Sequence, residues 1–261
     1  MNQIFHNPEI KQINYLDNRF YTKDEIHFFP SVTTVLEVFP KGFGFEQWLK
    51  DVGGNAKDIM ERAGKQGTVV HGGTEEMDRG GILKWADETG KANYTLKEWE
   101  MLLKYQNFRK VVTCELIANE MKLCSEGLKL GGTLDRVFKI AGELYLVDIK
   151  SSNYLHKSYE LQMAAYAMMW NEINPDNPIV HTAVLWLNSN VRTAKVDLEA
   201  KTFQGVGWQL KLFDRHYTDA WKVFEHVHKI WLEENPNYKP LNKIYPDTIS
   251  LNETETESVV A

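Results

Sequence analysis

The hydrophobic pattern of this chain changes period near residue 113, and that change limits the possible folds more than any other feature. Before it, apolar residues recur at helical spacing, most clearly over Leu96–Val112. After it, short apolar runs alternate with polar residues, as they do in strands. Helices followed by strands and further helices are typical of α/β folds, so we expect helices packed on a sheet.

Local signals place the individual elements. Residues 1–30 look like short extended pieces rich in aromatic side chains. Helical spacing or capping residues predict helices over Val32–Val38 (with Ser31 as N-cap), Asn55–Gly64, Thr68–Arg79, Leu96–Val112, Ser158–Asn171 and Gln209–Glu234. Alternation predicts strands over Leu116–Leu123, Leu130–Ile140, Glu143–Lys150, Val180–Leu187 and Val191–Leu198.

The chain shows no convincing linker, so we expect one α/β domain over residues 1–240. Its helical N-terminal subdomain would span about 31–112 and its core about 113–235. Residues 241–261 include the polar, acidic sequence LNETETESVVA, which predicts a flexible tail.

Composition excludes several classes of protein. With 30 basic and 36 acidic residues the net charge is −6, so nucleic-acid binding would need a local basic patch or a bound metal. Two cysteines, Cys114 and Cys124, cannot form a four-cysteine zinc or iron–sulfur site within this chain. They fit a reducing cytoplasm. The longest apolar stretch, Leu161–Trp170, is too short to cross a bilayer, so we expect no membrane partner.

The most informative segment is the predicted hairpin Gly131–Ser152. A turn at Ala141-Gly142 places Asp135 directly opposite Asp148. A four-residue loop would keep this pairing, whereas a three-residue loop with a bulge would shift it by one residue.

Alternation along the hairpin separates two faces. The predicted core face carries Leu134, Phe138, Ile140, Tyr145, Val147 and Ile149, with Arg136 as the exception. The other face carries Thr133, Asp135, Val137, Leu146, Asp148 and Lys150. Two carboxylates about 5 Å apart repel each other unless positive charge lies between them. Either Lys150 or a divalent cation could supply that charge.

Two carboxylates and a lysine suit phosphodiester hydrolysis. Carboxylates hold a metal that polarises the phosphate and activates water. The lysine can orient that water or neutralise charge in the transition state. The alternative is a salt-bridge cluster on an exposed face of the hairpin, because short Asp-x-Lys triplets are common.

Five pieces of sequence, in this order and spacing, resemble one family. They are G67-T-V-V-H71, Glu120, G131-G-T-L-D135, D148-I-K150-S-S, and Y159-x-x-Q162-x-x-x-Y166. The chain resembles the PD-(D/E)xK nuclease superfamily, and within it the RecB-type exonuclease branch. Leu134 replaces the proline of the family name, the second acid is Asp, and the iron–sulfur cysteines of some members are absent.

The resemblance implies a restriction-endonuclease-like core, with a mixed central sheet flanked by helices. It implies that Asp135 and Asp148 bind Mg²⁺ or Mn²⁺ together with the Ile149 carbonyl. It implies that His71 is a further ligand and that Glu120 contacts the metal or its water. Lys150 would assist the nucleophilic water, and Gln162 and Tyr166 would support the lysine and the substrate backbone.

The function implied is a Mg²⁺-dependent deoxyribonuclease, an exonuclease of DNA recombination, repair or phage DNA metabolism. It would act on DNA in the cytoplasm of a bacterial or phage-infected cell, with a single-strand-binding or recombination protein as partner. The alternatives are an endonuclease of the same superfamily, a catalytically silent DNA-binding module, and a hydrolase of another phosphate ester. Polarity, strand preference and oligomeric state have no signal in the sequence.

Several of these residues could have a structural role in place of a functional one. His71 could be a structural histidine, Glu120 a solvent-facing strand residue and Tyr166 a core residue; Glu75 could share a helix face with His71. Near the N-terminus, Lys41, Phe43, Phe45 and Trp48 could stack on unpaired bases, but such residues are more often core and turn residues.

Overall fold

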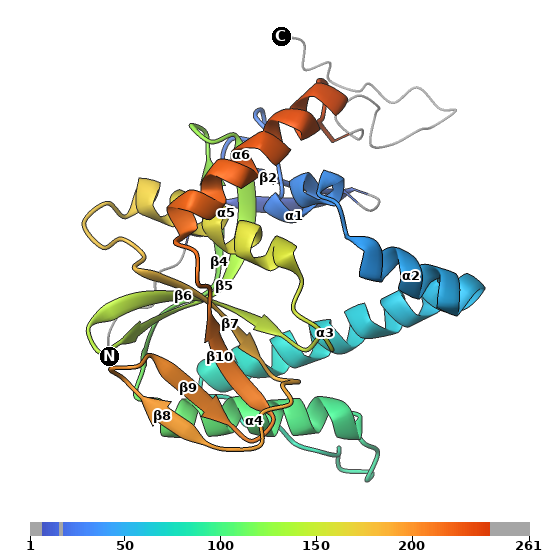
Figure 1. Cartoon of the computed structure of the whole chain (residues 1–261), viewed down its shortest axis with the longest axis vertical. Helices are drawn as coiled ribbons and strands as arrows, with labels where there is room; N and C mark the ends of the chain where they lie inside the picture. The colour runs from blue at the N-terminus through green and yellow to red at the C-terminus, as the bar shows by residue number, and fades with distance from the viewer. Residues whose placement is uncertain (1–6, 16–17, 241–261) are drawn as a thin grey trace, which may run out of the picture.

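The structure, a computed structural model that describes residues 7–15 and 18–240, is built on a seven-stranded mixed sheet with helices on both faces (Figure 1). The strand order is β4-β5-β6-β7-β10-β9-β8. The strands are β4 Glu115–Ser125, β5 Leu130–Ile140, β6 Glu143–Lys150, β7 His181–Trp186, β8 Lys195–Asp197, β9 Thr202–Gly205 and β10 Trp208–Leu212. This mixed sheet flanked by helices confirms the predicted fold class. The predicted flexible tail, 241–261, lies outside the described residues.

Strands β6 and β7 are the parallel pair, and the helix α5 (Lys157–Ile173) connects them. The other neighbouring strands of this sheet pair antiparallel. The β5–β6 turn is at Ala141 and Gly142, whose φ angles of 49° and 89° fit a two-residue type I′ hairpin. The turn predicted from the sequence is therefore present.

Each face of the sheet has its own hydrophobic core. Helices α5, α6 (Tyr217–Glu234) and the short α1 (Val32–Val35) cover one face, while α3 (Ala56–Asp78) and α4 (Leu96–Val111) cover the other. The hairpin face that carries Val137 and Leu146 is therefore buried, because it packs beneath α5. An exposed salt-bridge cluster on that face is excluded.

The N-terminal residues form a second, three-stranded sheet of β1 (Lys11–Tyr15), β2 (Asn18–Thr22) and β3 (Phe29–Pro30). Its Tyr21 is fully buried and packs directly over Gly131 of β5. Next in the chain, the Ser31 hydroxyl accepts from the Thr34 amide at 3.0 Å and caps α1, as predicted. The small sheet thus adds to the cover over the first residues of β5.

The helix α2 (Phe43–Val52) extends away from the sheet, between the 3₁₀ turns η1 (Leu36–Val38) and η2 (Gly53–Asn55) (Figure 1). It has no buried residue, and Phe43 is 76% exposed. The interpretation of Lys41, Phe43, Phe45 and Trp48 as core and turn residues is wrong for the core, because none of the four is buried. Lys41 lies over the Phe45 ring, which stacks on Trp48.

Four predicted elements need correction. The helices expected over Asn55–Gly64 and Thr68–Arg79 are one helix, α3, because its glycines lie within the helix without ending it. The strand expected over Val191–Leu198 is reduced to β8. The helix expected from Gln209 begins only at Tyr217. Residues before it form β10, where Trp208 and Leu210 are buried in strand alternation, and the unpredicted β9 pairs with it.

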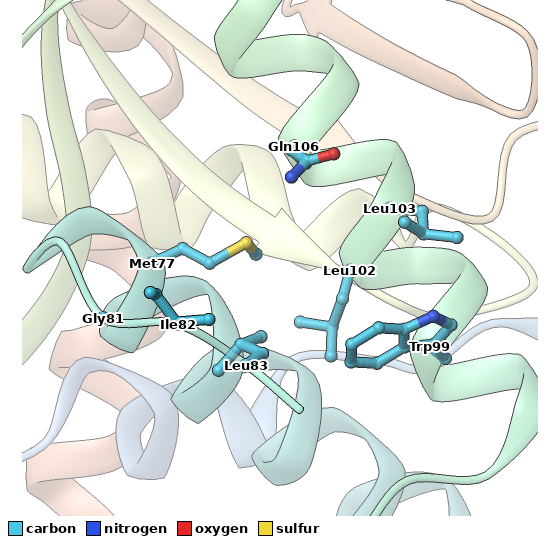
Figure 2. Close-up of a pocket in the computed structure, with 8 residues that line it drawn as sticks. All are labelled: Met77, Gly81, Ile82, Leu83, Trp99, Leu102, Leu103 and Gln106. Carbon is cyan, nitrogen blue, oxygen red and sulfur yellow. The ribbon is translucent and has the colours of Figure 1, made fainter. Parts of the chain in front are cut away.

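A shallow apolar pocket of about 230 Å³ opens between the C-terminal end of α3 and helix α4 (Figure 2). The residues that line it are Met77, Gly81, Ile82, Leu83, Trp99, Leu102, Leu103 and Gln106. None of them can ionise, so the chemistry of the protein is expected elsewhere. Among the described residues, no helix combines the length and the apolar character needed to span a membrane.

We predict opposite effects for alanine at two glycines. A Cβ at Gly132 would collide with the Tyr166 ring, so Gly132→Ala should lower the free energy of unfolding by about 1–3 kcal/mol. Gly64 lies exposed within α3 with open space around it, so Gly64→Ala should raise it by about 0.5–1 kcal/mol. Urea titrations of both variants measure the difference. Equal effects would contradict the close contact at Gly132.

Candidate active site

The candidate site lies where strands β5 and β6 separate. Their paired residues end at Arg136 and Val147, so the predicted register is correct but the ladder stops one pair before Asp135 and Asp148. The predicted Asp135–Asp148 cross-strand pair is therefore absent. Instead, Asp135 Oδ2 accepts a hydrogen bond from the Ile149 amide at 2.8 Å. A carboxylate thus closes the end of the ladder between the two strands.

Strand β4 is also irregular at this level. Glu120 has a φ of 47°, in the left-handed region that side chains other than glycine rarely occupy. Its Oε1 accepts from Arg136 Nη1 at 2.8 Å. Glu120 is therefore held among the site residues and is not a solvent-facing strand residue.

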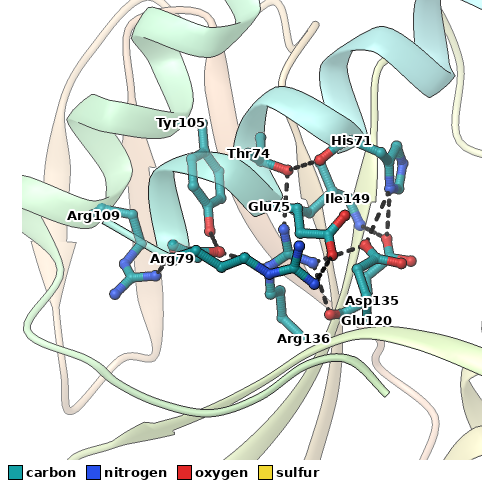
Figure 3. A network of polar contacts seen from close by, with 11 residues as sticks. His71, Thr74, Glu75, Arg79, Tyr105, Arg109, Glu120, Asp135, Arg136 and Ile149 are labelled. Carbon is teal, nitrogen blue, oxygen red and sulfur yellow. Dashed lines mark hydrogen bonds and ion pairs between the residues drawn. The ribbon is translucent and has the colours of Figure 1, made fainter. Parts of the chain in front are cut away.

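Helix α3 brings a third potential metal ligand, His71, close to the two carboxylates. His71 Nδ1 lies 3.4 Å from Asp135 Oδ2 and 4.0 Å from Glu120 Oε1 (Figure 3). One donor atom from each of His71, Glu120 and Asp135 lies within 4.8 Å of the others. Nitrogen and oxygen atoms grouped in this way can bind a divalent metal ion. Glu75 is not in this group, because it pairs with Arg79 at 2.5 Å.

The charges of the three donors depend on each other. Burial disfavours the charged His71 ring, but the carboxylates of Asp135 and Glu120 outweigh burial and raise its pKa to about 9. Burial also disfavours the Glu120 carboxylate, yet His71 and Arg136 lower its pKa below the ordinary value. The metal-free site therefore holds an imidazolium next to carboxylates.

Asp148 and Lys150 lie on the α5 side of the sheet. Lys150 Nζ forms an ion pair at 2.7 Å with Oδ2 of the buried Asp148. The ammonium also lies 4.5 Å from the centre of the Tyr159 ring, a residue of α5. The buried carboxylate and the aromatic ring together hold the ammonium on the α5 side of the site.

Protonation decides what this pair can do. Burial is the largest cause that raises the pKa of Asp148 to about 6. Burial would lower the pKa of Lys150, but the carboxylates of Asp148 and Asp135 outweigh it and raise that pKa. Lys150 is therefore protonated at neutral pH and can donate hydrogen bonds, but it cannot accept a proton.

Gln162 and Tyr166 are both buried on α5. Their side chains hydrogen-bond to each other, and burial raises the pKa of Tyr166 well above its ordinary value, so its hydroxyl stays neutral. The Tyr166 ring packs over Gly132, close to where β5 approaches Asp135. The structure therefore places Tyr166 both in the core and next to the site.

Behind the site lies a buried polar network that the sequence reasoning did not assign. Arg136 reaches Asp78 and Thr74 of α3, and Asp78 also binds Tyr105 and Arg109 of α4. Figure 3 labels Arg136, Thr74, Tyr105 and Arg109 of this network. Two signals could have revealed it. Arg136 interrupts a run of apolar positions on its strand face, and the helical positions 71, 74 and 78 share one face of α3.

Comparison with known proteins gives one family match. A profile described as the PD-(D/E)XK nuclease superfamily matches residues 55–239. Among solved structures, a "Putative exonuclease" from Eubacterium rectale is similar at 11% identity and a TM-score of 0.39, over 74% of this chain and 77% of that one. No curated protein matches the chain.

We predict that divalent-metal binding strengthens with pH. His71 must release its proton before it can bind a cation, so below its pKa of about 9 the affinity should rise about tenfold per pH unit. Calorimetric titration with Mg²⁺ and Mn²⁺ between about pH 7 and 8.5 measures this slope. His71→Gln should flatten it, and His226→Gln, at an exposed histidine of α6, should not. An unchanged slope in His71→Gln would contradict the role of His71.

Proposed function

The chain belongs to the PD-(D/E)XK nuclease superfamily, and from this premise we propose that it is a metal-dependent deoxyribonuclease that degrades DNA from its ends. The observation that carries the proposal is the group of His71, Glu120 and Asp135 next to the buried Asp148–Lys150 pair. A protein that only binds DNA has no need of carboxylates gathered around a histidine, because carboxylates repel the phosphates of DNA.

We assign the metal to His71, Glu120 and Asp135, with Asp148 and the Ile149 carbonyl completing the set that the sequence predicts. The carboxylates of Glu120 and Asp135 are oxygen ligands of the kind that Mg²⁺ and Mn²⁺ take, and they lie close enough to His71 to share one ion. When bound, the cation would polarise the scissile phosphate and lower the pKa of a water molecule.

The chain's own groups have distinct tasks. The protonated Lys150 donates to a phosphate oxygen or to the attacking water and offsets the charge that develops. Asp148 and the Tyr159 ring hold its ammonium in place. Gln162 and the neutral Tyr166 support this arrangement from α5.

The biological setting follows from the family resemblance. A net charge of −6 repels DNA at long range, so the positive charge of Lys150 and the cation must attract the substrate locally. We propose a role in DNA recombination, repair or phage DNA metabolism, in the cytoplasm of a bacterial or phage-infected cell. A single-strand-binding or recombination protein would deliver the substrate.

A cleavage assay tests the proposal. With Mg²⁺, the protein should degrade linear DNA and leave covalently closed circular DNA of the same sequence intact; EDTA should stop the reaction. Lys150→Ala should lower the rate by about 10²–10³-fold, because it removes a charged donor to the transition state. Lys139→Ala, at an exposed lysine of the same hairpin, is the matched control and should cleave normally.

Other outcomes separate the alternatives. Cleavage of the circle as well would identify an endonuclease of the same superfamily. Metal-independent DNA binding without cleavage of either form would favour a binding module. Faster hydrolysis of small phosphate esters than of DNA would favour a different phosphoesterase.

The Tyr159 ring gives a second prediction. A cation–π contact of this kind contributes about 0.5–2 kcal/mol, so Tyr159→Leu should slow cleavage by about 2–30-fold. Tyr159→Phe keeps an aromatic face and should retain most of the activity. Steady-state kinetics on linear DNA compares the two. If Tyr159→Phe loses as much activity as Tyr159→Leu, the hydroxyl of Tyr159, and not its ring, is what Lys150 needs.

A further inference from the structure

Arg136 is one of the largest fully buried side chains, with 0% of it exposed. A guanidinium remains charged inside a protein, so its buried donors need acceptors. Its Nε donates to Asp78 Oδ2 at 2.6 Å, its Nη2 to Thr74 Oγ1 at 3.1 Å, and its Nη1 to Glu120 Oε1 at 2.8 Å. Nη1 also donates to the Asp135 carbonyl at 2.8 Å. Each nitrogen therefore has an acceptor.

These acceptors belong to two parts of the fold. Asp78 and Thr74 lie on α3, the helix that also carries His71. Glu120 lies on β4, at the residue whose backbone is in the left-handed region. Arg136 therefore connects the helix that supplies one metal donor to the strand that supplies another (Figure 3).

Asp78 does not depend on Arg136 for its charge balance. Its side chain is only 2% exposed, but Arg109 and the Tyr105 hydroxyl also donate to it. Glu120 also has two neighbours, His71 on the site side at 4.0 Å and Arg136 behind it, whose Nη1 donates to Oε1 at 2.8 Å. Asp78 and Thr74 therefore fix the position of the Arg136 guanidinium, and the guanidinium in turn contacts Glu120, which faces the site.

We propose that Arg136 is a positioning residue for the metal site: anchored on Asp78 and Thr74, it holds the Glu120 carboxylate toward His71 and Asp135. This inference rests on the proposed metal-dependent function. It predicts that loss of the guanidinium weakens metal binding chiefly through the side chain of Glu120, because the contact of Arg136 with Asp135 is to its backbone carbonyl. Partners behind a ligand commonly change metal affinity by about 10–100-fold.

Arg109 provides the matched control. It binds the same Asp78 from α4 but has no contact with Glu120, His71 or Asp135 in the described residues. Arg136→Gln and Arg109→Gln each remove one guanidinium from Asp78. Only Arg136→Gln removes the hold on Glu120. A loss of stability should therefore occur in both variants, whereas a loss of metal affinity should occur only in Arg136→Gln.

The test is calorimetric titration of Mn²⁺ into the whole protein, with circular dichroism to verify folding. Arg136→Gln should weaken Mn²⁺ binding by about tenfold, and Arg109→Gln should change it less than about twofold. Glu120→Gln should also weaken it. The double variant Arg136→Gln with Glu120→Gln should bind no more weakly than the weaker single variant, because both act at one carboxylate.

Two results would overturn the inference: normal Mn²⁺ affinity in Arg136→Gln, or independent losses that multiply in the double variant. If Arg136→Gln does not fold, Arg136→Lys takes its place, because a lysine keeps the buried charge but has one nitrogen where the guanidinium has three to reach Asp78, Thr74 and Glu120. Weaker Mn²⁺ binding in Arg136→Lys supports the inference, and unchanged binding refutes it.

These measurements do not depend on cleavage. A protein that binds Mn²⁺ as described but cuts no DNA would refute the proposed function and leave the role of Arg136 standing. A protein that cuts DNA, and whose Arg136→Gln variant binds Mn²⁺ normally, would refute the role of Arg136 and leave the proposed function standing.

Discussion

The contact between Arg136 and Asp78 is the interaction on which the arrangement of this protein depends. Both side chains are buried, and their immediate partners come from α3, α4, β4 and β5. Buried ion pairs add little net stability over well-packed apolar residues, but removal of one partner costs about 3–5 kcal/mol. The pair therefore acts mainly by specifying geometry. It fixes how two helices lie against the sheet at the level of the site.

The sheet explains why the chemistry lies where it does. Both of its faces are covered, and the central strands β5 and β6 are buried along most of their length. Polar groups can gather only where the ladder opens, beyond Arg136 and Val147. There, Asp148 and Lys150 face α5, while Glu120 and Arg136 face α3. Asp135 lies between the two strands, so one opening brings groups from both faces together.

Much of this arrangement can be predicted from local sequence. The Ala141-Gly142 turn fixes the register of the hairpin, and the alternation along it places Asp148 and Lys150 on the correct face. The predicted alternation is wrong at Leu134, which packs in the same core as Val137, and at Asp135, which contacts His71 of α3. The break in the ladder has no local signal. It accompanies the left-handed backbone at Glu120 and a contact with Arg136, 16 residues away in sequence. The strand β10 also has no clear local signal, because its apolar residues continue into the helical spacing of the apolar residues of α6.

The hydrogen bond from the Ile149 amide to Asp135 has a practical consequence for anyone who wishes to trap this protein with an uncleaved strand. Asp135 accepts the last hydrogen bond between the two strands of the hairpin, and we propose that its carboxylate also binds the metal. Asp135→Ala removes both and leaves a backbone amide without its acceptor at the mouth of the site. Asp135→Asn removes the charge but keeps an oxygen for that amide. An inactive protein whose binding surface still resembles the active one therefore requires the amide side chain.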